Sequence, residues 1–243
     1  MENNNQIDRL KQEFIANASH ELKTPVTSIQ LAVETAINAL ESKKYDDAQL
    51  FLNQILKDSE RMTLLLSDLL DLSQLESNEP SKEFIELSSI IQSEVSYLSK
   101  KNLDRVIIES EEIYLYIDPD DFALIVRNLL RNACSYSEKD TKVKIRLYKN
   151  NEDVVLIIKD KGRGISLSDQ ERIFERFYRV DKGRSRNLGG TGIGLSLVKH
   201  AVDRNRGNIT LKSQLGEGST FTVFFKLEDE WTFIRQRVVL VKF

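Results

Sequence analysis

A histidine, a carboxylate and a hydroxyl lie close together near the start of this 243-residue chain. Glu21 directly follows His20, and Thr24 comes four residues after the histidine, so Thr24 and His20 share one face of a helix. If the Glu21 carboxylate accepts a hydrogen bond from Nδ1–H, the lone pair on Nε2 points outward as a nucleophile. An isolated His–Glu pair is more often an exposed helical pair without chemistry, so this motif needs support from the rest of the chain.

Two asparagines form a second candidate site. Asn128 and Asn132 are four residues apart in an amphipathic helical segment, which turns both amides to one side while Leu129 and Leu130 turn to the core. Amide oxygens in this arrangement suit Mg²⁺, which takes oxygen ligands together with substrate phosphates. The alternative is a pair of solvated asparagines.

An aspartate followed by two glycines forms a third candidate. Asp160, Gly162 and Gly164 come directly after the apolar run 154–158. The carboxylate at this strand end suits the exocyclic amine of a base, while the glycines let the backbone approach a flat ring. The same three residues are also typical of an ordinary turn.

A second glycine-rich segment precedes the helical run 195–202 and contains Gly190, Thr191, Gly192 and Gly194. Backbone N–H groups at such a helix start can bind phosphate. A dinucleotide-binding fingerprint is not expected, because that motif follows a first strand and needs a ribose-binding acid after a second strand.

The N-terminal third of the chain predicts two long helices. Residues 7–40 carry apolar side chains at steps of three and four, and Pro25 inside this pattern predicts a kink. After the polar turn 41–47, a second helix has its predicted apolar seam at Leu52, Ile55, Ser59, Met62, Leu66 and Leu69, with extra leucines at 65, 70, 72 and 75. Because one hairpin cannot cover both stripes, we expect a four-helix bundle made by two chains.

Beyond a turn-rich linker at 78–83, strand-like and helical runs alternate and predict an α/β sandwich, in which helices cover one mixed sheet. The expected strands are 84–87, 105–109, 112–117, 142–149, 153–160, 207–213 and 219–226. The expected helices are 88–100, 119–136, 169–177 and 192–205. The long, charged and glycine-rich stretch 161–191 is typical of a lid or binding loop.

Composition excludes several classes of protein. A net charge of -3 argues against a nucleic-acid-binding surface, and one cysteine with two histidines excludes an internal disulfide and a Cys/His metal cluster. No apolar run approaches the roughly 18–20 residues of a membrane-spanning helix. We therefore expect a soluble chain in a reducing, intracellular setting, which is a fragment of a longer membrane protein if its first helix continues upstream.

Taken in order, these motifs resemble those of the bacterial sensor histidine kinases over roughly residues 8–227. Ser19–Pro25 resembles the phosphoacceptor box, Asn128–Ser137 the asparagine box, Phe174–Tyr178 the phenylalanine box, and the two glycine-rich segments the two glycine boxes. The resemblance implies an α + α/β chain with four parts. These are a dimeric helical hairpin (1–77), a linker (78–83), an ATP-binding catalytic α/β sandwich (84–227) and an unassigned C-terminal tail (228–243).

The resemblance also implies an enzyme, a protein histidine kinase that uses ATP and Mg²⁺ to phosphorylate His20 and then an aspartate of a response regulator. Asn132 is implied as the Mg²⁺ ligand, Asn128 and Arg179 as phosphate contacts, and Asp160 as the reader of the adenine amine. Glu21 is implied to assist the kinase step and Thr24 to assist dephosphorylation of the regulator. The base pocket and lid are implied at Gly162, Gly164, Gly190, Thr191, Gly192 and Gly194.

The implied partners are a second copy of the chain and a receiver domain, with no nucleic acid. Contact with a membrane is implied only through a sensor region absent from this chain, which places the chain on the cytoplasmic side of an inner-membrane parent protein.

Two features depart from the family's pattern. Ser135 stands where many relatives carry a basic residue, so a phosphate-side charge must come from Arg131, or from Arg184 and Arg186 in the lid. The tail 228–243, with the single tryptophan Trp231, has no assignable counterpart.

Two alternative functions remain. An ATPase of the same nucleotide-binding superfamily would carry a glutamate at the position of Asn128 to activate water, and a scaffold without catalysis would not need the motifs above.

Overall fold

The computed structural model describes residues 2–138, 140–180 and 190–227. The chain divides into two compact units. One contains the residues up to Gln74 together with Glu175–Ile193, and the other contains Leu75–Phe174 and the residues from Gly194 on. Arg184 and Arg186 of the predicted lid and the predicted tail 228–243 lie outside the described residues.

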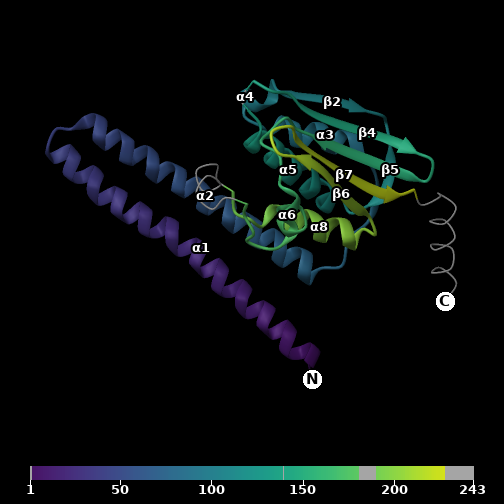
Figure 1. Cartoon of the computed structure of the whole chain (residues 1–243), viewed down its shortest axis with the longest axis horizontal. Coiled ribbons are helices and arrows are strands. Elements are labelled where there is room, and N and C mark those ends of the chain that lie inside the picture. Colours follow the sequence, from purple (N-terminus) through teal and green to yellow (C-terminus); the bar gives the residue numbers. More distant parts are fainter. Residues whose placement is uncertain (1, 139, 181–189, 228–243) are drawn as a thin grey trace. The chain divides into compact units, whose positions relative to one another are not determined.

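The first unit is built on a hairpin of two long helices, as predicted (Figure 1). They are α1 (Glu2–Glu41), which runs through Pro25, and α2 (Tyr45–Ser77). Ala32, Ala36 and Ala39 of α1 are buried at steps of four and three. These small side chains form a buried stripe along α1.

In the single chain, the buried face of α2 lies one residue before the predicted apolar seam, so the predicted seam is wrong by one position. Two of its members, Leu52 and Leu66, are 52% and 47% exposed. The residues that are buried instead follow the same three-and-four spacing and include charged ones: Asp58, Arg61, Leu65, Asp68, Leu72 and Leu75. The charged residues are tolerated there because they have polar partners. Asp58 accepts from Ser28 at 2.7 Å and Arg61 lies 2.7 Å from Glu21, both across the hairpin, while Asp68 accepts from Thr191.

The second unit contains a five-stranded mixed sheet in the order β2-β4-β5-β7-β6. Its strands are β2 (Val106–Ser110), β4 (Val143–Asn150), β5 (Asp153–Lys159), β6 (Asn208–Gln214) and β7 (Gly218–Lys226). Only β2 and β4 are parallel, and every other neighbouring pair is antiparallel. Buried and exposed residues alternate along β4, as expected for a sheet with one covered face.

Helices cover that face, which confirms the predicted α/β sandwich (Figure 1). They are α3 (Leu87–Ser96), α5 (Pro119–Tyr136) and α8 (Gly194–Arg204), with the short α4 (Lys100–Leu103), α6 (Leu167–Gln170) and 3-10 turn η1 (Arg172–Phe174) in the connections. The helix predicted at 169–177 is thus replaced by two short turns. Phe177 has a left-handed φ of 62° and its N–H donates to the Gly192 carbonyl, so a helix cannot continue there.

Two predicted strands do not join the main sheet. β1 (Glu83–Glu86) and β3 (Tyr114–Ile117) pair with each other in a separate antiparallel sheet. Each is four residues long and leads straight into a helix of the covering layer, β1 into α3 and β3 into α5. The two strands therefore lie beside that layer and complete each other's hydrogen bonds.

A buried polar cluster fastens the start of α5 to the end of α8. Asp118 caps α5, accepting from the N–H groups of Asp120 and Asp121, with Pro119 at the first helical position. The Asp121 carboxylate accepts from Asn205 at 2.6 Å and lies 2.9 Å from Nε of Arg204.

The same cluster holds the linker. The N–H of Ser81 donates to Asp118 at 2.6 Å, and Arg204 donates to the carbonyl of Leu75 at 2.9 Å. Residues 75–81 are therefore tied to both helices of the covering layer.

No helix within the described ranges is long and apolar enough to cross a membrane.

The cluster predicts a pH dependence of stability. Burial raises the pKa of Asp121 to about 6, and the nearby Asp118 carboxylate adds to the rise, while Asn205 and Arg204 oppose it. An unfolded aspartate titrates near pH ~3.9, so the folded chain binds this proton more tightly and gains stability as the pH falls from about 7 to about 4. Between about pH 7 and about pH 4, the free energy of unfolding of the unchanged chain, measured in urea, should rise by about 2 kcal/mol more than that of the Asp121→Asn variant. The same pH dependence in both chains would contradict the shift.

Candidate nucleotide and phosphoacceptor sites

Helix α5 holds the asparagines of the predicted metal and phosphate site. Asn128 is 2% exposed, its Nδ2 donates to the carbonyl of Leu124 at 3.0 Å, and its Oδ1 accepts from Arg131 at 2.6 Å. The alternative of two solvated asparagines is therefore wrong for Asn128. Asn132 lies one turn further along α5, half-buried, and its amide has no hydrogen-bond partner among the described residues. That amide oxygen remains available to a ligand.

Gly194 brings the start of α8 against this face of α5. A Cβ atom at Gly194 would lie 2.6 Å from Oδ1 of Asn128 and 2.9 Å from Nη2 of Arg131. A side chain at this position would displace the Asn128 amide and the Arg131 guanidinium, so glycine suits the close approach. The first N–H groups of α8 and the Arg131 guanidinium therefore lie near one another, an arrangement suited to an anion.

Asp160 directly follows β5 and is buried, with 5% exposure. Its Oδ1 accepts from the N–H of Gly162 at 2.7 Å and from the N–H of Ser219 at 3.2 Å. Burial raises the pKa of this carboxyl, and the two N–H donors oppose the rise. Oδ2 has no donor among the described residues, which leaves an acceptor for an amine of a bound molecule.

A backbone bridge joins the Asp160 turn to the end of α5. Gly162 pairs with Ser137, directly after α5, and a Cβ at Gly162 would lie 2.3 Å from the carbonyl oxygen of Tyr136. The α/β unit thus assembles six of the predicted site residues in one connected region: Asn128, Asn132, Asp160, Gly162, Gly164 and Gly194.

The remaining predicted residues belong to the unit of the hairpin: His20, Glu21, Thr24, Arg179, Gly190, Thr191 and Gly192. His20 is exposed on α1, and the Thr24 hydroxyl donates to its backbone carbonyl at 3.1 Å. An exposed imidazole on a helix can reach a second molecule or a second unit without rearrangement of the helix.

The hydrogen bond hypothesised between Glu21 and Nδ1 of His20 is absent from the described structure, because consecutive side chains of a helix do not face each other. The Glu21 carboxylate instead lies 2.7 Å from Nη2 of Arg61 and 3.2 Å from Nη2 of Arg179. Arg61, on α2, was not predicted. Its only signal in the sequence is a position three residues after Asp58 and four before Leu65, on the buried seam.

The lid residues are held by polar contacts within this unit. Thr191 donates to Asp68, and Arg179 donates to the carbonyl of Gly190. Gly192 has a φ of 79°, and a Cβ there would lie 2.9 Å from the carbonyl carbon of Phe177.

Replacement by alanine should cost different amounts of stability at two glycines, Gly164 and Gly216. Gly164 has a φ of 70°, and a Cβ on it would lie 1.9 Å from the Gln214 carbonyl oxygen. Gly216 has a similar φ of 81° but nothing within 4 Å of its Cβ position. Gly216→Ala should therefore cost only the left-handed backbone, about 1–2 kcal/mol. Gly164→Ala should cost about 3 kcal/mol or more, because backbone must also move. Denaturant unfolding checks the difference, and equal losses would show that the packing of this turn is looser than described.

Two family models match the chain in this order. Residues 10–78 match the His Kinase A (phospho-acceptor) domain, and residues 117–229 match the histidine kinase-, DNA gyrase B- and HSP90-like ATPase. The chain is similar in fold to the Acinetobacter baumannii histidine kinase AdeS, with a TM-score of 0.66, 23% identity and coverage of 86% of this chain and 98% of that one.

The curated relatives are similar over nearly the whole chain. The sensor protein kinase WalK of Staphylococcus saprophyticus is 35% identical over 233 residues, which are 92% of this chain and 38% of that protein. The sensor-like histidine kinase SenX3 of Mycolicibacterium smegmatis is 35% identical over 229 residues, 89% of this chain and 58% of that protein. The chain thus spans about 40–60% of the length of these relatives. On the two matched domains and these relatives, the chain belongs to the two-component sensor histidine kinases.

Proposed function

We propose that the chain binds ATP with Mg²⁺ in its α/β unit and transfers the γ-phosphoryl group to Nε2 of His20. From there the group passes to an aspartate of a response-regulator receiver domain. The observation that carries this proposal is that the candidate acceptor and the candidate nucleotide-binding groups lie in different units. An exposed histidine lies on the hairpin, while a buried amine acceptor and an anion-binding helix start lie in the α/β unit.

The α/β unit suits ATP at both ends of the molecule. Oδ2 of Asp160 would accept from the adenine amine, and the start of α8 with Arg131 would bind the phosphates. In this arrangement Arg131 supplies the charge that Ser135 does not, and Asn128 acts by holding the guanidinium through its Oδ1.

Asn132 is the residue proposed to hold Mg²⁺. The described residues contain no cluster of three or more histidine, cysteine or acidic side chains that could hold a metal. Mg²⁺ bound by one amide oxygen, water and substrate phosphates needs no such cluster, and it would neutralise charge on the phosphates during transfer.

The state of Asn128 favours a kinase over an ATPase. A general base for water must accept a proton, and the Asn128 amide is buried, lacks a basic group and has both polar atoms engaged. A scaffold without catalysis has no use for the acceptor on Asp160.

Glu21 and Thr24 are proposed to serve opposite activities. Glu21 is held by Arg61 and Arg179, so it can act on His20 only after it exchanges these partners. The Thr24 hydroxyl donates to the His20 carbonyl, which leaves its oxygen free to accept from a water that attacks the phosphorylated regulator. We assign phosphatase activity to Thr24 on this basis.

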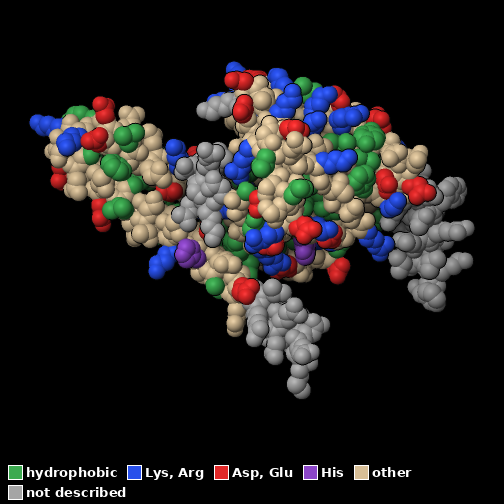
Figure 2. All heavy atoms as spheres, viewed as in Figure 1, with side chains coloured by type: hydrophobic (Ala, Val, Ile, Leu, Met, Phe, Trp, Pro, Cys, Tyr) green, Lys and Arg blue, Asp and Glu red, His purple; other side chains and the backbone are tan. Residues whose placement is uncertain are grey.

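The hairpin is proposed to dimerise with a second copy. Apolar side chains remain at its surface, where hydrophobic groups are visible in Figure 2. Those of α1 and α2 with at least 39% exposure include Ile15, Val26, Leu31, Val33, Ile37, Leu40, Leu50, Leu52, Leu56, Leu66 and Leu70. They include two members of the predicted α2 seam, and a second hairpin would cover them.

Because ATP and receiver domains are intracellular, we place the chain on the cytoplasmic side of a parent protein longer than itself.

The first test is replacement of the acceptor. His20→Gln should abolish labelling of the chain by γ-labelled ATP, because the nucleophilic nitrogen is gone. ATP affinity measured by calorimetry should stay within about twofold, because His20 is not among the residues proposed to contact the nucleotide. Label that persists in this variant, in acid-labile form, would mean that another histidine is the acceptor.

A second test separates the phosphate contact from the base contact. Arg131→Ala should weaken ATP binding about tenfold or more, the size of a lost charge-assisted hydrogen bond, and leave adenosine binding unchanged. Arg127→Ala, one turn earlier and exposed on the same helix, removes the same charge and is the control. Adding Ser135→Lys to Arg131→Ala should restore part of the affinity. An equal loss for ATP and adenosine would show that Arg131 supports the fold of the pocket instead.

A further inference from the structure

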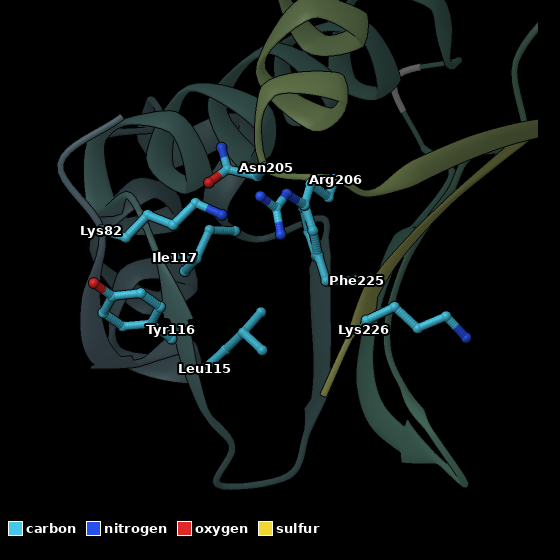
Figure 3. A pocket seen from close by; sticks show the side chains of 8 residues that line it. All are labelled: Lys82, Leu115, Tyr116, Ile117, Asn205, Arg206, Phe225 and Lys226. Atoms are coloured by element: carbon cyan, nitrogen blue, oxygen red, sulfur yellow. The ribbon is translucent and has the colours of Figure 1, made fainter. Parts of the chain in front are cut away.

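A pocket outside the proposed ATP site lies where β3, the end of α8 and the end of β7 meet (Figure 3). Its volume is about 210 Å³. An engineered apolar cavity of about 150 Å³ holds benzene, so this pocket has room for a larger aromatic ring. None of its lining residues belongs to the nucleotide or phosphoacceptor sites.

The pocket combines an apolar floor with basic side chains. Leu115, Ile117 and Phe225 are each at most 4% exposed and form the floor. Lys82 and Arg206 line the pocket with long cationic side chains (Figure 3), and neither has a side-chain ion pair or hydrogen bond among the described residues.

Lys226 also lines the pocket, but its ammonium is engaged elsewhere. It lies 3.0 Å from Asp153 and 3.7 Å from Glu152. Of the three cationic side chains that line the pocket, Lys82 and Arg206 thus have no acidic partner among the described residues. A ligand with an apolar group next to negatively charged groups would suit this pocket.

The chain itself carries such a segment in its sequence shortly after Lys226, which lines the pocket. The described residues end at Leu227, one residue after Lys226, and the sequence continues Glu228-Asp229-Glu230-Trp231. Trp231 is five residues beyond Lys226, a reach of up to about 17 Å for extended chain. Three consecutive acids followed by an indole match two unpaired cations above an apolar floor.

We propose that the segment Glu228–Trp231 of the same chain occupies this pocket, with Trp231 on the apolar floor and its acids opposite Lys82 and Arg206. The pocket touches β3, which leads into α5, and the end of α8, so the occupied pocket would brace both helices of the nucleotide site from the side opposite their ligand-binding ends. This gives the tail a role that the family resemblance does not supply.

Trp231 is the only tryptophan, so its fluorescence in the full chain reports on the proposal directly. We expect blue-shifted emission and protection from acrylamide quenching. Lys82→Glu with Arg206→Glu should shift the emission to the red and raise the quenching constant severalfold, toward that of free tryptophan amide. The matched control is Lys101→Glu with Lys212→Glu, which makes the same charge change at two exposed positions outside the pocket and should leave both readings unchanged.

A charge-swapped variant distinguishes loss of the tail contact from misfolding of the pocket. Adding Glu228→Lys and Glu230→Lys to the reversed pocket should restore blue-shifted, protected emission, which a misfolded pocket would not do. Emission that resembles free tryptophan amide in the unchanged chain would overturn the proposal. So would emission that shifts with protein concentration, because the pocket would then hold the tail of a second copy.

Discussion

The proposed nucleotide site depends on a buried aspartate, Asp160, with one carboxylate oxygen held by the protein and the other left open. Asp160 is fixed at the end of β5 because its Oδ1 receives two backbone N–H groups, from Gly162 and from Ser219 at the start of β7. Its Oδ2 has no donor among the described residues and stays open to a ligand that brings one, such as an amine. The close packing at Gly162, Gly164 and Gly194 serves this arrangement, since each glycine removes a side chain where backbone or a polar group must pass.

In the hairpin, the proposed phosphoacceptor His20 is exposed, and the carboxylate of the next residue, Glu21, is held by ion pairs. Two arginines hold Glu21, while His20 on the same helix is open to solvent. Phosphoryl transfer by positioning needs the acceptor to move to the nucleotide or the nucleotide to the acceptor, and an exposed histidine permits this at little cost. Under the proposed function, the ion pairs of Glu21 restrain the kinase step until Glu21 exchanges its partners.

Local sequence pattern sufficed for most of the fold because most elements bury one face by a regular period. The alternation in β4 and β7 and the three-and-four spacing in α5 correspond closely to the observed elements. Pairing partners were beyond such a pattern: β1 and β3 join each other because of where their helices pack, which is a non-local constraint. The α2 seam was misplaced because two stripes with the same spacing lie one residue apart. The buried one includes Asp58, Arg61 and Asp68, whose burial depends on partners far away in the sequence: Ser28, Glu21 and Thr191.

The candidate sites show the same division. Asp160 could be placed at a strand end, and Asn128 on an amphipathic helix, from the sequence alone. The link between Asn128 and Arg131 and the engagement of Glu21 by Arg61 required the structure, because the side-chain rotamers and the packing of α8 decide them.

The central claim is that the γ-phosphoryl group of ATP ends on the imidazole of His20. The most direct measurement is to incubate the full chain with ATP and Mg²⁺, digest it at alkaline pH and locate the phosphate by mass spectrometry. We expect phosphate on the peptide that contains His20, stable in alkali and lost in acid. Phosphate on a serine, threonine or aspartate, or release of free phosphate with no labelled peptide, would contradict the account.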